Sequence, residues 1–146
     1  MTNSNYKSIV NHYEKCFEEH GDTPLGMDWP NLKDMILRYS VMAEVVNNED
    51  DFSILDFGCG TARFLEFLNE HYHGRFNYVG LDLGETYIDF AREKYPQYQF
   101  LNVDILTQAE RVPTLDYVVM NGVLTEKREL SHEEMWDYTR ELLLKT

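Results

Sequence analysis

The sequence lacks the features that mark several large classes of protein. No apolar run in its 146 residues approaches the length of a membrane-spanning helix, and the opening MTNSNYKSIV contains no apolar segment of signal-peptide length. The only cysteines are Cys16 and Cys59, which are too few for a disulfide framework and favour a reducing compartment. There is also no internal repeat and no low-complexity tract. These absences predict a cytoplasmic protein with no membrane partner.

Basic residues are scarce as well. The chain has 13 Lys and Arg against 26 Asp and Glu, a formal net charge of −13. A protein this acidic is repelled by the phosphates of nucleic acids, and no cluster of Lys and Arg suggests a local exception. We therefore expect no nucleic-acid partner. The hydrophobic fraction of 43% is ordinary for a folded protein, and the length predicts one domain over residues 1–146.

The hydrophobic pattern changes near residue 50. Residues 6–20 and 32–46 carry apolar side chains at helical spacing, so residues 1–48 are expected to form a helical cap on an α/β core over 49–146. The polar NNEDD of residues 47–51 is expected to be a turn between them. The buried stripe of the second helix is expected to comprise Leu32, Met35, Ile36, Tyr39, Met42, Ala43 and Val46.

Short apolar strands then alternate with helices. Strands are expected at 52–57, 76–81, 98–103 and 115–120, and helices at 64–71, 86–95 and 131–144, the last with a capping box formed by Ser131 and Glu134. Strict alternation implies right-handed crossovers and a doubly wound, mainly parallel Rossmann-like α/β sheet covered on both faces. Ligands of such sheets bind beyond the carboxyl ends of the strands.

Acidic residues lie at the ends of the first two predicted strands. Asp56 lies two residues before Gly58 in DFGCG, and Gly58 and Gly60 allow the backbone to turn sharply and to approach a ligand closely. Asp82 ends the second strand in YVGLDLG, where its two oxygens can each accept a hydrogen bond from a ribose hydroxyl. The alternatives are an ordinary tight turn with a solvated Asp56 and a helix N-cap at Asp82.

The third and fourth strands end in residues of compatible chemistry. Asp104 can recognise the edge of an adenine while Ile105 packs on its face, although a plain turn aspartate is the alternative. Asn121 and Gly122 end the fourth strand. Four strand ends that all carry residues able to bind a nucleoside are much less expected by chance than one such strand end. The sequence therefore favours a nucleoside-binding site at this edge of the sheet.

A dinucleotide-binding enzyme fits these residues less well. Its phosphate loop requires glycine at the position of Arg63, and the Asp56 carboxylate would lie unfavourably close to a pyrophosphate. No Gly-Lys-Ser/Thr follows the glycines, so a Walker-type phosphate loop is absent. The acidic residue suits a cationic ligand better.

Four segments together resemble the class I S-adenosylmethionine-dependent methyltransferases. They are ILDFGCGTARF (54–64), YVGLDLG (78–84), FLNVDI (100–105) and LDYVVMNGVLTEK (115–127), so the resemblance spans roughly residues 50–145. It implies strand order 3-2-1-4, S-adenosylmethionine as cofactor with S-adenosylhomocysteine as product, and methyl transfer to an unidentified small-molecule acceptor. Ala62 replaces the third glycine of the family motif.

The resemblance also implies a role for each strand end. The segment Asp56, Phe57, Gly58, Cys59 and Gly60 would hold the methionine part, with Asp56 orienting its amino group. Asp82 would hold the ribose hydroxyls and Leu83 would touch the adenine, whose edge and face would meet Asp104 and Ile105. Asn121 and Gly122 would flank the sulfonium and the acceptor. No catalytic base is implied.

The resemblance is incomplete at one side of the sheet. The family fold continues past the fourth strand, whereas this sequence ends at ELLLKT, which would leave the fourth strand as an open edge. We expect either a homodimer that covers this edge or a partial cover from the first two helices. The alternative function is a truncated, non-catalytic module that binds the cofactor or a partner subunit.

Several other residues are weaker candidates. His12, Cys16 and His20 follow at i, i+4 and i+8, but the outer two are about 12 Å apart along a helix, so we expect no metal ion. His132 is a candidate base because it follows the fourth strand. The N-terminal residues that can cap the cofactor are Tyr13, Trp29 and Arg38.

Overall fold

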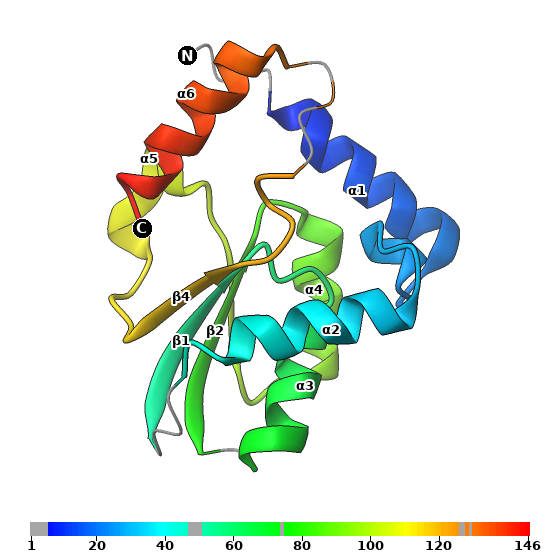
Figure 1. Cartoon of the computed structure of the whole chain (residues 1–146), viewed down its shortest axis with the longest axis vertical. Coiled ribbons are helices and arrows are strands. Elements are labelled where there is room, and N and C mark those ends of the chain that lie inside the picture. Colours follow the sequence, from blue (N-terminus) through cyan, green and yellow to red (C-terminus); the bar gives the residue numbers. More distant parts are fainter. Residues whose placement is uncertain (1–5, 47–50, 74, 126–127, 129) are drawn as a thin grey trace.

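The computed structural model describes residues 6–46, 51–73, 75–125, 128 and 130–146 (Figure 1). Its elements are α1 (Lys7–His20), η1 (Leu25–Met27), α2 (Leu32–Ala43), β1 (Phe52–Phe57), α3 (Arg63–Tyr72), β2 (Phe76–Asp82), α4 (Glu85–Lys94), β3 (Gln99–Asn102), α5 (Ile105–Gln108), η2 (Ala109–Arg111), β4 (Tyr117–Met120) and α6 (His132–Leu143), where η denotes a 3₁₀ helix. The turn expected at 47–51 lies outside the described residues, apart from Asp51.

The four strands form one parallel sheet in the order β3-β2-β1-β4, which confirms the doubly wound α/β architecture. Asp56 pairs with Gly80 on one side and with Val119 on the other, so the tips of β1, β2 and β4 end at the same level. This register gathers the residues that follow each strand at one edge of the sheet. In Figure 1, α1 lies beyond these carboxyl ends.

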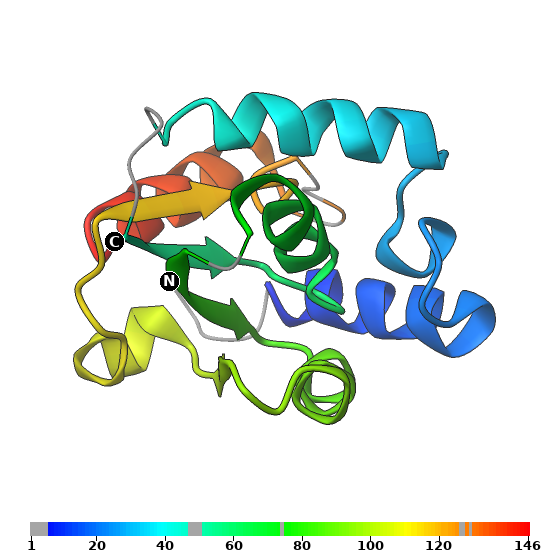
Figure 2. The same cartoon turned by 90° about the horizontal axis from the view of Figure 1, so that it is seen from below.

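Alternate residues of the strands enter two separate cores, one on each face of the sheet. Ile54 and Tyr78 pack with α2, α3 and α4, whereas Leu55 and Val79 pack with α5, α6 and the start of α1. In Figure 2, α6 lies behind β4 and α3 lies nearer the viewer, and the two helices belong to different cores. The alternation follows from the period of two along a strand, which directs neighbouring side chains to opposite faces.

The buried face of α2 is narrower than its sequence suggests. Met35, Tyr39 and Ala43 are buried, but Leu32 is 55% exposed and Ile36 is 42% exposed, so the expected burial of these two residues is wrong. The helix contacts essentially one neighbour, α3, and a single contact buries only the row at i, i+4 and i+8. Leu32 and Ile36 lie on the adjacent row of the helix surface.

No helix within the described part of the chain is both long and apolar enough to cross a bilayer.

Candidate functional site

A cavity of about 170 Å³ opens at the carboxyl ends of β1, β2 and β4. Of the residues predicted to bind a cofactor, all but two line it: Asp56, Phe57, Gly58, Cys59, Gly60, Asp82, Leu83, Asn121 and Gly122. The parallel register of the strands brings these residues together, although they come from three separate parts of the sequence. The exceptions are Asp104 and Ile105.

The turn between β1 and α3 is shaped by two glycines in the left-handed region. Gly58 has φ +80° and Gly60 has φ +52°, conformations that residues with a Cβ rarely adopt. The backbone N–H of Gly58 donates to the carbonyl oxygen of Leu81 at 2.7 Å, which fixes the turn to the end of β2. A Cβ added to Gly58 would lie 2.4 Å from Cγ2 of Val123, so the loop after β4 packs directly on this backbone.

Ala62 and Cys59 also belong to this turn. Ala62 has φ +63° and lies at the N-terminal end of α3, a position that glycine would adopt without strain. Cys59 is buried, and burial raises the pKa of its thiol, so it fills space and is not a reactive nucleophile.

Asp56 is a buried carboxyl group at the base of the cavity. Its side chain is 3% exposed and accepts a hydrogen bond of 2.6 Å from the hydroxyl of Tyr78. Burial raises the pKa of Asp56 to about 7, the Tyr78 hydrogen bond opposes that rise, and the charge of Asp82 adds to it. Asp56 therefore titrates near neutral pH, and a cation beside it would favour its ionised form.

Asp82 is held by the backbone on both sides. Its two carboxylate oxygens accept 2.9 Å hydrogen bonds from the N–H groups of Gly60 and Gly84, one bond on each oxygen. Burial raises the pKa of Asp82, while these N–H donors oppose the rise. Each oxygen has a second lone-pair direction, so the carboxylate can still accept two hydrogen bonds from a ligand.

Asn121 carries a polar atom without a partner. Its side-chain nitrogen Nδ2 is buried and makes no hydrogen bond. Within the part of the chain that the structure describes, no other buried side-chain nitrogen or oxygen lacks a partner. Buried amide groups are nearly always satisfied, so this exception leaves an available donor in the cavity wall. The neighbouring Gly122 has φ +87° and lies against the ring of Trp29.

Asp104 and Ile105 lie outside the cavity lining. The hydroxyl of Tyr6 makes a short hydrogen bond to Asp104, whose other oxygen caps α5 by accepting from the N–H of Leu106 at 3.0 Å. Tyr6 stacks on Tyr138, with ring centroids 5.6 Å apart, and Ile105 is buried beneath them. The start of α1 thus covers the tip of β3, and the Tyr6 hydroxyl contacts the carboxylate that was expected to recognise an adenine.

The N-terminal segment forms the opposite wall of the cavity. Tyr13 and Trp29 line it, as expected from the sequence, and Arg38 packs on the Trp29 ring at 5.1 Å instead of entering the cavity. No sequence signal pointed to Tyr87, whose hydroxyl lies 2.6 Å from the carbonyl oxygen of Tyr13 and 2.7 Å from that of Gly26. His132 is exposed at the start of α6 and does not line the cavity.

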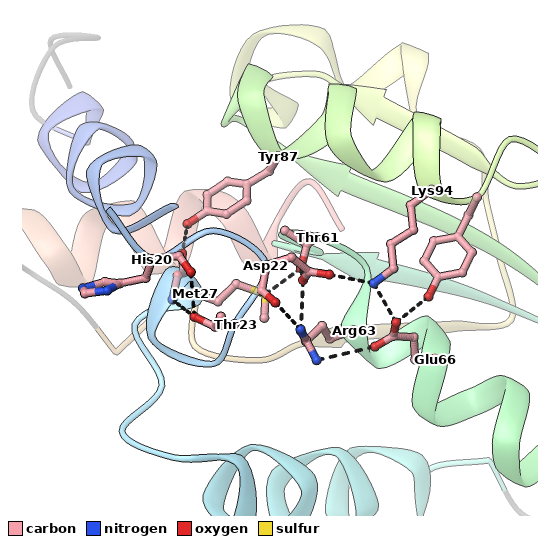
Figure 3. Close-up of polar contacts among 11 residues, drawn as sticks. His20, Asp22, Thr23, Met27, Thr61, Arg63, Glu66, Tyr87 and Lys94 are labelled. Carbon is pink, nitrogen blue, oxygen red and sulfur yellow. Dashed lines mark hydrogen bonds and ion pairs between the residues drawn. The ribbon is translucent and has the colours of Figure 1, made fainter. Parts of the chain in front are cut away.

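An ionic network fixes this segment to the core (Figure 3). Asp22, in the loop after α1, accepts hydrogen bonds from Thr61 at 2.7 Å, from Arg63 Nε at 3.0 Å and from Lys94 Nζ at 2.8 Å. Lys94 also pairs with Glu66 at 2.6 Å. The glycine turn, α3 and α4 thereby hold the loop that carries the cavity wall.

The fold and the cavity define the class: a Rossmann-like α/β domain whose ligand site lies at the switch point of a parallel sheet. The family model described as "methyltransferase domain" matches residues 55–144. The chain belongs to this family, which confirms the resemblance to class I S-adenosylmethionine-dependent methyltransferases. No curated protein matches the sequence.

Solved structures of other proteins share the fold at low identity. A TehB-like S-adenosylmethionine-dependent methyltransferase from Corynebacterium glutamicum is 18% identical, with a TM-score of 0.50; the match covers 80% of this chain and 56% of that protein. Phosphoethanolamine N-methyltransferase 1 from Haemonchus contortus, solved with S-adenosylhomocysteine, is 16% identical with a TM-score of 0.61; the match covers 98% of this chain and 30% of that protein. The [4+2]-cyclase SpnF is 19% identical with a TM-score of 0.56; the match covers 76% of this chain and 40% of that protein. The chain therefore spans between 30% and 56% of the lengths of these proteins.

Proposed function

We propose that the cavity binds S-adenosylmethionine and that the protein transfers its methyl group to a small-molecule acceptor. The observation that carries this proposal is the convergence of Asp56, Asp82 and the unpartnered Nδ2 of Asn121 on one cavity at the strand tips. A cationic ligand with two vicinal hydroxyls matches that set, because a buried carboxyl favours a cation and the free lone pairs of Asp82 suit a ribose.

The residues of the chain mainly bind and orient the cofactor, and no proton transfer is assigned to them. Asp82 would hold the ribose, Asp56 the amino group, and the glycine turn would let the backbone approach the methionine part. When bound, S-adenosylmethionine supplies a methyl group on a cationic sulfur, which an acceptor nucleophile takes as the carbon–sulfur bond breaks, leaving the neutral thioether. Tyr13 and Trp29 would exclude water from that step.

The adenine end is the least complete part of the proposed site. An adenine that packs on the face of Ile105 must displace part of its cover, because Ile105 is buried in the cluster that contains Tyr6 and Tyr138. We propose that residues 1–48 act as a cap on the core of 49–146, and that the first turn of α1 moves when the cofactor enters.

A second candidate is a module that binds the cofactor or a partner subunit without transferring methyl. The [4+2]-cyclase SpnF supports this candidate, since it shares the fold but is named for a reaction other than methyl transfer. A dinucleotide site is disfavoured, because the Asp56 carboxyl lies beneath the glycine turn where a pyrophosphate would bind.

Isothermal titration calorimetry with S-adenosylmethionine, S-adenosylhomocysteine and NADH tests the proposal. We expect both adenosyl compounds to bind and NADH not to bind. Asp82→Asn should weaken their binding about tenfold or more, because each lost hydrogen bond to a charged group is worth roughly 1.5–3 kcal/mol. Asp89→Asn is the matched control, since Asp89 is exposed on α4 and away from the cavity.

Two outcomes distinguish the candidates. No binding at millimolar concentration, or an Asp82→Asn variant that binds like the wild type, would reject the cofactor site. Binding without methylation of any acceptor in a broad panel would favour the non-catalytic module. Activity that appears only after a second subunit is added would instead indicate a split enzyme.

We also propose a homodimer in the cytoplasm. Among the described residues β4 pairs only with β1, which leaves its other edge available to the same edge of a second copy. Both cysteines are free thiols, which agrees with a reducing compartment.

A further inference from the structure

Three side chains with metal-binding atoms converge at the rim of the cavity. His12 and Cys16 lie one turn apart on α1, and Asp28 follows η1 in the left-handed conformation. The Nε2 atom of His12 is 2.9 Å from Oδ2 of Asp28 and 3.6 Å from Sγ of Cys16. All three ligand atoms lie within 4.8 Å of one another.

The geometry of this cluster differs from that of a catalytic triad. In a triad the acid and the nucleophile contact opposite nitrogens of the imidazole, so that a proton can pass across the ring. Here the carboxylate oxygen and the sulfur both approach the same nitrogen, Nε2. Three ligand atoms that face one point are arranged to bind a single cation together and not to relay a proton.

The separations suit a tetrahedral ion. Zinc bonds of about 2.0–2.3 Å place neighbouring ligand atoms roughly 3.3–3.6 Å apart. The 3.6 Å separation lies in that range, and the 2.9 Å separation reaches it after a movement of a few tenths of an ångström. The third separation, between Cys16 and Asp28, lies within 4.8 Å, so closing it to that range takes a movement of about an ångström at most. A thiolate with an imidazole and a carboxylate favours zinc over magnesium or calcium, which prefer oxygen ligands.

A positive charge already occupies this point. The guanidinium of Arg128 makes a short contact with Nε2 of His12 and lies 3.3 Å from Oδ2 of Asp28. His12 and Cys16 are half-buried and Asp28 is exposed, so an ion from solution can reach them. The cluster is therefore a place where the chain holds a cation, and a divalent ion can compete with Arg128 for it.

We propose that His12, Cys16 and Asp28 bind a divalent metal ion of the zinc class, which displaces Arg128. Asp28 also lines the cavity, so the ion would lie at the cavity rim. Three protein ligands leave the fourth position of a tetrahedral ion open to water or to an electron-rich group of a bound molecule. The ion would also tie α1 to the loop before α2. This proposal goes beyond the methyltransferase function and does not depend on cofactor binding.

Titration of the chelator-treated full chain with Co²⁺ alone, followed by competition with Zn²⁺, tests the site. We expect one equivalent to bind, with the intense visible bands of four-coordinate cobalt and a near-ultraviolet band from the thiolate. Cys16→Ser should abolish the thiolate band, and Asp28→Asn should weaken binding on the order of 10- to 100-fold. Asparagine tolerates the left-handed conformation of Asp28, so this variant should keep its fold.

Two further variants sharpen the test. His20→Ala removes the other histidine of α1, which lies outside the cluster, and should leave Co²⁺ affinity unchanged. Arg128→Gln removes the competing cation and should tighten binding. Zn²⁺ should raise the thermal midpoint of the wild type but not that of Cys16→Ser, a readout that needs no enzymatic activity.

Opposite results would overturn the proposal. These are cobalt spectra without a thiolate band, equal affinity in the wild type and Asp28→Asn, or a loss in His20→Ala as large as that in Asp28→Asn. Circular dichroism of each variant without metal confirms that the fold is intact. None of these measurements involves S-adenosylmethionine, so failure here leaves the proposed function untouched.

Discussion

At the scale of single residues, the environment of a carboxyl group decides its chemistry. Asp56 and Asp82 both end strands and look equivalent in the sequence. In the structure Asp82 accepts two backbone N–H bonds, whereas Asp56 accepts one hydroxyl of Tyr78 in a buried position. Donors from the backbone support a carboxylate, and burial with a single donor favours the neutral acid. The two residues are therefore suited to different parts of a ligand.

This environment predicts a pH-dependent contribution of Asp56 to stability. Its pKa is raised from 3.8 to about 7, so between these values the folded state holds a proton that the unfolded state has released. The free energy of unfolding should therefore fall as pH rises through this window, by up to about 1.4 kcal/mol per pH unit. Urea unfolding at pH 5 and pH 7 measures the difference.

Asp56→Asn provides the control for that measurement. The amide cannot ionise, yet its oxygen still accepts the Tyr78 hydroxyl, so the part of the pH dependence due to Asp56 should disappear. Equal pH dependence in the variant and the wild type would show that the carboxyl has an ordinary pKa.

At the scale of elements, long periodic segments were predictable and short ones were not. The bounds of β1 agree with the sequence prediction, and α6 begins with the expected capping box. The short helices η1, α5 and η2 were missed, because three or four residues are too few to show a helical period. β3 and β4 are each two residues shorter than expected, since pairing with a neighbour and not hydrophobicity sets their ends.

The capping box of α6 gives a prediction at this scale. Oγ of Ser131 accepts from the N–H of Glu134 at 3.2 Å, and the Glu134 carboxylate accepts from the N–H of Ser131 at 2.8 Å. Ser131→Ala should lower the free energy of unfolding by about 1 kcal/mol. Urea denaturation measures it, with Ser40→Ala on the exposed part of α2 as the control that should change little. A cost near zero would mean that α6 is held by its packing alone.

At the scale of the molecule, one carboxylate joins the N-terminal segment to the core. Burial opposes ionisation of Asp22, but hydrogen bonds from Lys94 and Thr61 and the charge of Arg63 outweigh it and hold its pKa below the ordinary value. The stability that it contributes is present above that ordinary value and is lost as pH falls through the lowered one.

Asp22→Ala should therefore destabilise the protein by about 2 kcal/mol, a value between those of exposed and buried ion pairs. The loss should be seen in urea unfolding at pH 7 and should shrink in strong acid, where the wild-type carboxyl is protonated. Glu18→Ala, on the exposed side of α1, is the control. A loss of equal size at pH 7 and in strong acid would contradict an ionic origin.

The proposed dimer is tested at the edge of the sheet. Val118 on β4 is 38% exposed, and a lysine there opposes pairing of the edge with another strand. Sedimentation should give a dimer for the wild type and a monomer for Val118→Lys. Gln97→Lys adds the same charge near the opposite edge, just before β3, and should stay dimeric. A monomeric wild type at micromolar concentration would make the homodimer proposal wrong.

Three features of this protein could be read from the order of its residues alone: the alternation of strands and helices, the glycine turn and the acidic strand ends. These features are local: a period of two or 3.6 and a backbone with positive φ are encoded in a few neighbouring residues. Parallel strands then bring their carboxyl ends to one edge, so most of the candidate site followed from these signals.

Which of these groups are covered by other parts of the chain depends on the packing of the folded molecule. Tyr6 covers Asp104 from 98 residues away, and Asp28, not His20, joins His12 and Cys16. Such contacts depend on how helices pack over the sheet, and no local period encodes that packing. Hydrogen bonds and ion pairs between distant residues form only once the chain has folded, so the structure alone shows which donors and acceptors they use.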